Sequence, residues 1–166
     1  MRVLVTGGAG YIGSHTCVEL LKAGHEVFVI DNLSNGHKTS LERVRLITNC
    51  ELQFKNADIQ DANALDKIFN TFKPDSVIHF AGLKADGEST ADPIKYYDIN
   101  VGGSISLLSA MSKAGCRRIV FSSSATVYGE PQYLPYDEKY PTNPVNLYGR
   151  TKLIIENIIN NWIKSR

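Results

Sequence analysis

Short apolar runs alternate with longer amphipathic segments along this chain, and this alternation constrains the fold more than any other feature. The amphipathic segments have helix length and helix ends, as where Asp92 and Pro93 begin one that ends at Gly115. Repeated alternation of strands and helices implies parallel strands joined by right-handed crossovers. The sequence therefore predicts an α/β protein with a doubly wound parallel sheet (Rossmann), in strand order 3-2-1-4-5. The five expected strands are Arg2–Thr6, Glu26–Ile30, Glu51–Asn56, Ser76–Ala81 and Arg118–Ser122.

Length and charge limit the classes of function. The 166 residues suffice for one domain over residues 1–166, and a net charge of +1 with scattered Lys and Arg argues against nucleic acid or an anionic membrane as partner. Cys17, Cys50 and Cys116 are widely spaced, and the histidines lack ligand spacing, so we expect reduced thiols and no metal site. The chain has no basic leader and no apolar run of membrane-spanning length, so we expect a cytoplasmic protein.

A glycine-rich turn follows the first expected strand. Gly7, Gly10 and Gly13 are spaced G-x-x-G-x-x-G between that strand and an amphipathic helix. Gly7 and Gly10 would let the backbone approach a diphosphate, Gly13 would let the helix pack closely on the strand, and the helix offers free N–H groups. A glycine pattern alone is weak, but its place between strand and helix makes it specific for a dinucleotide site.

Two acidic residues follow the next strands. Asp31 ends the second strand, where a carboxylate accepts hydrogen bonds from ribose hydroxyls and repels the 2′-phosphate of NADP. Asn32 and Leu33 follow it rather than Arg, which favours NAD, although Lys38 on the adjoining loop is a cation that would attract phosphate. Asp58, past the third strand, is placed either to meet the adenine amino group or to cap a helix.

The fourth and fifth strand ends carry further candidates. Gly82 would let backbone approach the cofactor, and Lys84 would neutralise phosphate. Ser122, Ser123 and Ser124 end the fifth strand, and Ser124 is the best candidate to hydrogen-bond a substrate hydroxyl. After it, residues 125–146 form a connection rich in Pro and Tyr, and such long connections usually have a function.

Tyr148 and Lys152 are four residues apart on the last expected helix, roughly Val145–Lys164, and so share one face. A free tyrosine has a pKa near 10, but an adjacent ammonium and a cationic nicotinamide favour the phenolate, which can take a proton from an alcohol. A Y-x-x-x-K pair alone is common by chance. Behind a glycine turn and a serine-bearing strand end, it indicates hydride-transfer chemistry.

These features together resemble the extended short-chain dehydrogenase/reductase family, over the whole chain. Within it, Ala81–Ser89, Tyr96–Val101 and Ser122–Gly129 closely resemble UDP-glucose 4-epimerases. The resemblance implies an NAD-dependent isomerase of galactose metabolism that interconverts UDP-glucose and UDP-galactose. Tyr148 would take the proton of the 4′-hydroxyl while hydride passes to bound NAD, and the 4-keto sugar would turn over and be reduced on its other face.

The resemblance also implies contacts and partners. The substrate would be a UDP-hexose, and two helices per subunit, around Ile94–Lys113 and Val145–Lys164, would form a homodimer. Lys152 would also hold the nicotinamide ribose, and Ser124 and Tyr148 would contact NAD. The remaining implied cofactor contacts are Tyr11, Ile12, Asp31, Asn32, Leu33, Ser34, Asn35, Gly36, Asp58, Ile59, Phe80, Ala81, Gly82, Leu83 and Lys84.

Two departures keep alternatives open. The first is Ile99, at a position where these epimerases generally have Asn beside the cofactor. The second is the C-terminal region that binds the UDP-sugar in these epimerases, which we expect to be lacking here. One alternative is an NAD-binding fragment without turnover. Another is a sugar-nucleotide 4,6-dehydratase, which needs an Asp-Glu pair where this chain has Ala125 and Thr126. Further alternatives are a related nucleotide-sugar reductase and a simple alcohol or steroid dehydrogenase, and the dehydrogenase would release NADH.

Overall fold

The computed structural model describes residues 1–165, except for the side chains of Asp86 and Glu88. The chain divides into two compact units. One, the sheet unit, comprises residues 1–81 and 105–122, and the other, the helix unit, comprises residues 82–104 and the chain from residue 123 onward.

The sheet unit is built on five parallel strands in the order β3-β2-β1-β4-β5, which confirms the predicted topology. Three strands are shorter than expected, because each extends only as far as its pairing with a neighbour. The pairing of β3 begins at Gln53, and the last pair of β4 and β5 is His79 with Phe121. The serines expected to end the fifth strand therefore follow it directly. The strands are β1 (Arg2–Thr6), β2 (Glu26–Asp31), β3 (Gln53–Asn56), β4 (Ser76–His79) and β5 (Ile119–Phe121).

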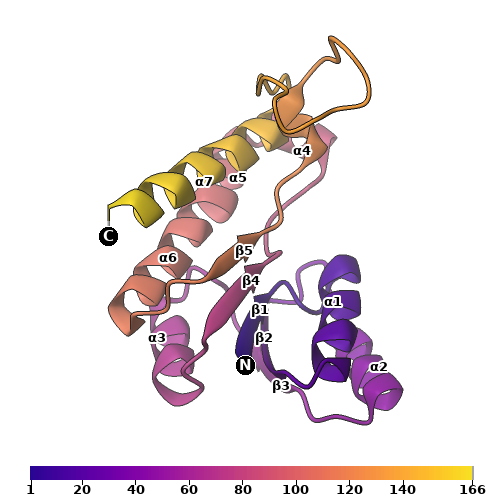
Figure 1. Ribbon diagram of the computed structural model, residues 1–166, viewed down its shortest axis with the longest axis vertical. Coiled ribbons are helices and arrows are strands. Elements are labelled where there is room, and N and C mark those ends of the chain that lie inside the picture. The colour runs from indigo at the N-terminus through magenta and orange to yellow at the C-terminus, as the bar shows by residue number, and fades with distance from the viewer. Residues whose placement is uncertain (166) are drawn as a thin grey trace. The chain divides into compact units, whose positions relative to one another are not determined.

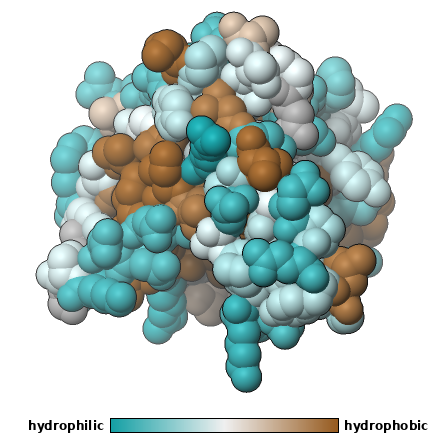
Figure 2. Space-filling view, turned by 90° about the horizontal axis from the view of Figure 1, so that it is seen from above, coloured by the Kyte–Doolittle hydropathy of each residue, from teal (hydrophilic) through white to brown (hydrophobic). Residues whose placement is uncertain are grey.

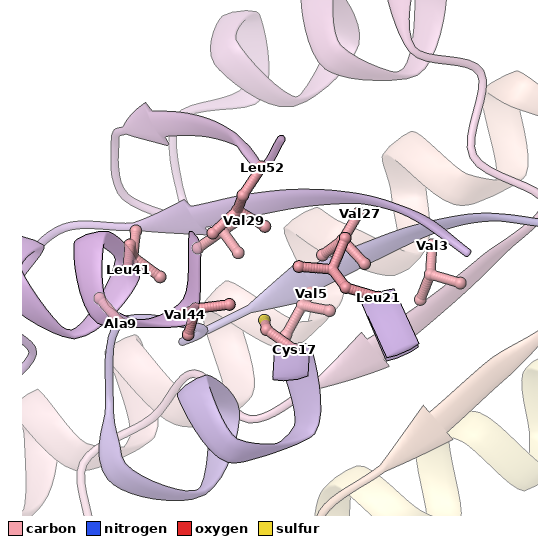
Figure 3. Close-up of a cluster of buried hydrophobic side chains, with 10 residues drawn as sticks. All are labelled: Val3, Val5, Ala9, Cys17, Leu21, Val27, Val29, Leu41, Val44 and Leu52. Carbon is pink, nitrogen blue, oxygen red and sulfur yellow. The ribbon is translucent and has the colours of Figure 1, made fainter. Parts of the chain in front are cut away.

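Helices cover both faces of this sheet (Figure 1). Helices α1 (Tyr11–Lys22) and α2 (Lys38–Thr48) lie on one face, and α3 (Ala62–Thr71) lies on the other. Alternate residues of β1 and β2, such as Val5 and Val29, point to the first face and pack with side chains of α1 and α2 in a buried cluster (Figure 3). This packing fixes the position of the turn between β1 and α1. The members of the cluster are Val3, Val5, Ala9, Cys17, Leu21, Val27, Val29, Leu41, Val44 and Leu52.

The helix unit is mainly helical. Helix α5 begins after Asp92, whose side chain accepts a hydrogen bond from the Lys95 N–H at 3.1 Å, as the sequence predicted. The expected continuous helix up to Gly115 is interrupted by a π-helical turn that the sequence did not reveal. The elements are α4 (Asp86–Ala91), α5 (Pro93–Tyr96), the π turn η1 (Tyr97–Gly102), the start of α6 (Gly103–Ala114), the 3-10 turn η2 (Ala125–Tyr128) and α7 (Leu147–Lys164).

The long connection before α7 packs against itself. The rings of Tyr128 and Tyr136 stack at 5.1 Å, and those of Tyr133 and Tyr140 lie 4.6 Å apart. At Gly129 the backbone adopts φ +72°, and a Cβ would lie 2.0 Å from the Asn143 carbonyl oxygen, so only glycine fits. The connection is thus a compact loop held by its own aromatic rings.

Candidate dinucleotide-binding and catalytic site

The glycine turn leaves no space for side chains. A Cβ at Gly7, where φ is +68°, would lie 2.7 Å from the Ala81 nitrogen, and one at Gly13 would lie 2.3 Å from the Gly7 oxygen. Gly13 therefore lets the start of α1 pack closely against the turn that directly follows β1. Gly10 is less constrained, since its Cβ would be 3.3 Å from the same oxygen. Gly10 also caps α1 without a side-chain hydrogen bond, so the first N–H groups of the helix remain available to an anion.

Asp31 ties the end of β2 to this turn. One carboxylate oxygen accepts the Ala9 N–H at 3.0 Å, and the other accepts the Leu33 N–H at 2.8 Å. The loop that follows β2 also folds back onto Ala9. A Cβ at Gly36 would lie 3.0 Å from Ala9, and the His37 N–H donates to the Ala9 oxygen at 3.3 Å. The structure thus brings the glycine turn and Asp31–Gly36 together at one edge of the sheet.

Asp58 joins the same edge. Its carboxylate accepts hydrogen bonds from the Asn32 side chain at 2.7 Å and from the Gln60 N–H at 2.9 Å. The expectation that Asp58 caps a helix is wrong, because Asp61 caps α3 by accepting the Ala64 N–H at 3.0 Å. The next residue after Asp58, Ile59, has a buried side chain, so any contact it makes with a ligand must come from its backbone.

Thr6 fixes the end of β4, a role that the sequence did not suggest. Its hydroxyl lies 2.6 Å from Nδ1 of the buried His79 and accepts the Ala81 N–H at 3.3 Å. Its carbonyl accepts the Phe80 N–H at 3.0 Å. Phe80 and Ala81 are therefore held against the residue that precedes the glycine turn.

In the helix unit, Asn100 clamps the loop after Ala81. Its side chain accepts the Leu83 N–H at 2.7 Å, and it donates to the Leu83 oxygen at 3.0 Å and to the Thr151 hydroxyl at 3.2 Å. Gly82 lies beside the Asn100 side chain. A Cβ on Gly82 would crowd the Asn100 side-chain oxygen, so the absence of a Cβ leaves room for that oxygen. Sequence reasoning missed Asn100, although it noted its neighbour Ile99, which is half-buried. Lys84 extends from the same loop and is exposed.

Ser124 begins the η2 turn and accepts two hydrogen bonds from one residue. The Thr126 N–H donates to its hydroxyl oxygen at 3.2 Å, and the Thr126 hydroxyl donates to it at 2.9 Å. A hydroxyl oxygen that accepts two hydrogen bonds retains only its own hydrogen for a further partner. Ser124 is therefore oriented as a donor.

Helix α7 lies directly against this turn. A Cβ at Gly149 would be 2.7 Å from the Thr126 carbonyl oxygen, so the first turn of α7 approaches η2 as closely as backbone permits. Farther along the helix, Glu156 accepts a hydrogen bond from the Ser123 hydroxyl. The serine-bearing segment is thus attached to α7 on both sides of Ser124.

Tyr148 and Lys152 share one face of α7, as predicted. The Lys152 ammonium lies 5.7 Å from the centre of the Tyr148 ring. Tyr148 is half-buried, whereas Lys152 is only 4% exposed, and burial lowers the pKa of its ammonium to about 8. Lys152 therefore still carries most of its positive charge at pH 7.

The candidate residues form two sets, each within one unit. The sheet unit holds Gly7, Gly10, Gly13, Asp31–Gly36 and Asp58, which suit a dinucleotide, and the helix unit holds Ser124, Tyr148 and Lys152, which suit proton transfer. Among the described residues, no group of three or more Cys, His, Asp or Glu side chains is arranged to hold a metal ion. In the same part of the chain, no helix has the length and apolarity needed to cross a bilayer.

Comparison with known proteins decides the family. The NAD dependent epimerase/dehydratase family matches residues 3–166, nearly the whole chain. The chain belongs to this family. Relatives include a UDP-glucose 4-epimerase of Bacillus subtilis, 55% identical over 96% of this chain and 47% of the relative, and one of Dictyostelium discoideum, 51% identical over 99% and 48%. The resemblance to UDP-glucose 4-epimerases is thereby confirmed, and the chain spans about half the length of these relatives.

Solved structures give the same result. A UDP-glucose 4-epimerase from Stenotrophomonas maltophila with bound NAD and formylated UDP-arabinopyranose superposes with a TM-score of 0.96 and 46% identity, covering 99% of this chain and 49% of that one. One from Bifidobacterium longum in complex with NAD+ and UDP gives a TM-score of 0.95 and 46% identity, covering 97% and 48%. The Rossmann fold agrees with the sequence prediction, and this chain spans about half the length of each of these two structures.

Proposed function

We propose that this chain is the NAD-binding part of a UDP-glucose 4-epimerase, with Ser124, Tyr148 and Lys152 as its catalytic residues. The observation that carries the proposal is the coincidence of two features in one chain. A glycine turn too tight for any side chain lies beside Asp31, and a Tyr–Lys pair lies on a helix packed against Ser124 and Thr126.

The sheet unit fits the diphosphate and ribose of NAD. Gly7 and Gly13 leave a cradle that a Cβ would fill, and the uncapped start of α1 offers N–H donors. Asp31 already accepts one backbone N–H on each oxygen, and each oxygen keeps a free lone pair for a ribose hydroxyl. A 2′-phosphate at that position would meet a carboxylate, so NAD is favoured over NADP.

The helix unit fits an alcohol that loses a proton and a hydride. NAD, when bound, accepts the hydride and returns it. Tyr148 as phenolate takes the hydroxyl proton, and the positive charge of Lys152 stabilises that phenolate. Ser124, left with only its own hydrogen to donate, stabilises the oxygen from which the proton departs.

The alternatives differ in specific residues. A 4,6-dehydratase needs an acid–base pair where this chain has Ala125 and Thr126, and the Thr126 hydroxyl is engaged with Ser124. An alcohol dehydrogenase would release NADH after each reaction. An NAD-binding module without turnover would bind the cofactor and leave UDP-hexoses unchanged. Product analysis separates the four.

The test is to incubate the purified chain with NAD and UDP-galactose and to measure bound cofactor, NADH absorbance and UDP-glucose. We expect NAD to bind and UDP-glucose to form more slowly than about 1 per second, the lower end of typical enzyme rates. The relatives are about twice as long, so the binding energy that positions the sugar is reduced. Tyr148→Phe should abolish any residual conversion.

Three results would contradict parts of the proposal. Failure to bind NAD would refute the cofactor assignment. Release of free NADH or formation of a dehydrated sugar would assign one of the other enzyme classes. A rate of roughly 1–1000 per second would show that this half needs no further region for catalysis.

We also propose that the chain forms a homodimer through α5–α6 and α7. Large apolar side chains on these helices are exposed, including Ile94 at 76% and Ile163 at 53%. Figure 2 shows apolar residues reaching the surface on the face that it draws. Light scattering at micromolar concentration should give a dimer mass, and Ile94→Asp should lower it. A monomer mass for the unmodified chain would contradict this proposal.

A further inference from the structure

A hollow lies at the edge of the sheet opposite the glycine turn. It has a volume of about 550 Å³ and is lined by the start of β1 and by the loops that lead into β4 and β5. These loops meet the amino ends of the parallel strands, whereas the glycine turn and Asp31 follow carboxyl ends. The hollow lies wholly within the sheet unit.

Four cations from distant parts of the sequence line this hollow. Arg2, Lys73, Arg117 and Arg118 face a single carboxylate, that of Asp75. The whole chain has a net charge of only +1, and its Lys and Arg residues are scattered along the sequence. The fold therefore concentrates positive charge at this hollow.

Asp75 already pairs with Arg2. Its carboxylate accepts the Arg2 backbone N–H at 2.7 Å and lies 3.5 Å from the guanidinium. The backbone hydrogen bond from Arg2, helped by the charge of its guanidinium, lowers the pKa of Asp75, so this pair is neutral overall. Among the ion pairs of the described residues, none includes Lys73, Arg117 or Arg118.

Carbonyls at the two nearby helix ends accept backbone N–H groups. At the end of α6, the Gly115 and Cys116 N–H groups donate to Ser112 and Met111 at 3.2 and 3.0 Å. At the end of α3, the Phe72 N–H donates to Ile68 at 2.8 Å. Carbonyls in the last turns of both helices thus have backbone partners.

The loops that carry the cations are held in place by the sheet. The Arg118 carbonyl accepts the Val77 N–H at 2.9 Å, and the Arg2 carbonyl accepts the Asp75 N–H at 2.8 Å. A cationic hollow on a rigid backbone requires little rearrangement to bind an anion.

We propose that this hollow is a binding site for a small polyvalent oxyanion bearing phosphate groups. Arg117 and Arg118 supply planar guanidinium groups that match phosphate oxygens, and Lys73 adds a third positive charge. The phosphate groups can belong to free inorganic diphosphate or to a nucleoside diphosphate, because the recognising chemistry is the same.

The test is titration of the ¹⁵N-labelled chain with inorganic diphosphate, followed by NMR. Amide signals of Lys73, Asp75 and residues 114–118 should shift to saturation with a stoichiometry of one. Arg117→Gln/Arg118→Gln should weaken binding at least tenfold, whereas Arg43→Gln, which removes an exposed arginine of α2, should leave it unchanged. Raising the salt concentration should weaken binding, because exposed charges are screened. A parallel titration with ADP, followed at the same amide signals of the hollow and not at those of residues 7–13, identifies the source: equal affinity indicates that phosphate groups suffice, and tighter binding indicates a nucleotide.

The proposal is overturned if no saturable shift occurs up to about 10 mM diphosphate, a concentration at which even millimolar binding would be evident. It is also overturned if the shifts appear only at residues 7–13, since the anion would then occupy the glycine turn. Thermal unfolding checks that the double variant is folded. If it is not, Lys73→Gln alone must weaken binding at least threefold, and unchanged binding in that variant refutes the site.

Discussion

Lys152 provides the most quantitative prediction, because burial lowers the pKa of its ammonium from 10.5 to about 8. One pKa unit corresponds to about 1.4 kcal/mol, so burying this charge destabilises the folded chain by roughly 3 kcal/mol wherever Lys152 is protonated in both states. Well below pH 8, the free-energy cost of burying the Lys152 charge is constant. Between pH 8 and 10.5 the unfolded chain binds the proton more strongly than the folded chain, so the contribution of Lys152 to stability becomes more favourable as pH rises.

Two measurements check this. NMR titration of the Lys152 side chain should give a midpoint near pH 8. Urea denaturation gives the free energies of unfolding of Lys152→Met and of the unmodified chain. The difference between these two free energies should change by roughly 3 kcal/mol between pH 8 and 10.5. Lys38→Met, which alters an exposed lysine, is the matched control. A midpoint of 10 or above, or a pH-independent difference, would refute the reasoning.

The chemical consequence follows from the same shift. Above pH 8, Lys152 loses the charge that stabilises the Tyr148 phenolate, so any proton transfer by Tyr148 should lose that assistance on the alkaline side.

Substitutions at four further positions test the packing of the site. Gly13→Ala should weaken NAD binding by about 100-fold or more, and Gly10→Ala by clearly less, because their Cβ atoms would lie 2.3 and 3.3 Å from the Gly7 oxygen; isothermal titration that ranks them equally would disprove this. Gly149→Ala should lower the free energy of unfolding by about 1–3 kcal/mol, since its Cβ would press on backbone; an unchanged urea midpoint would speak against that packing. Thr126→Val should slow reduction of NAD by UDP-galactose about tenfold while Thr126→Ser retains the rate, and equal rates in both variants would remove the orienting role of the hydroxyl.

The sequence predicted the sheet well, because its determinants are local. Alternating apolar strands and amphipathic helices admit few topologies, and a glycine turn after the first strand selects among them. Caps such as Asp92 were visible for the same reason, since a cap and the N–H that it accepts are three residues apart.

The sequence did not reveal features that depend on distant partners. Asn100 is an unremarkable amide in the sequence, and only the fold brings Leu83 and Thr151 to its side chain. The π turn that contains it has no distinct composition. The burial of Lys152, the double acceptance by Ser124 and the cationic hollow likewise arise from segments that meet only after folding.

Titration of the purified 166-residue chain with NAD and with NADP is the decisive measurement for the dinucleotide site. We expect saturable NAD binding and at least about tenfold weaker NADP binding, since a carboxylate facing a 2′-phosphate costs about 1–4 kcal/mol at 4 Å. Asp31→Ala should narrow that difference to about threefold or less. Equal dissociation constants for the two cofactors in the unmodified chain, or no binding of NAD, would contradict the account.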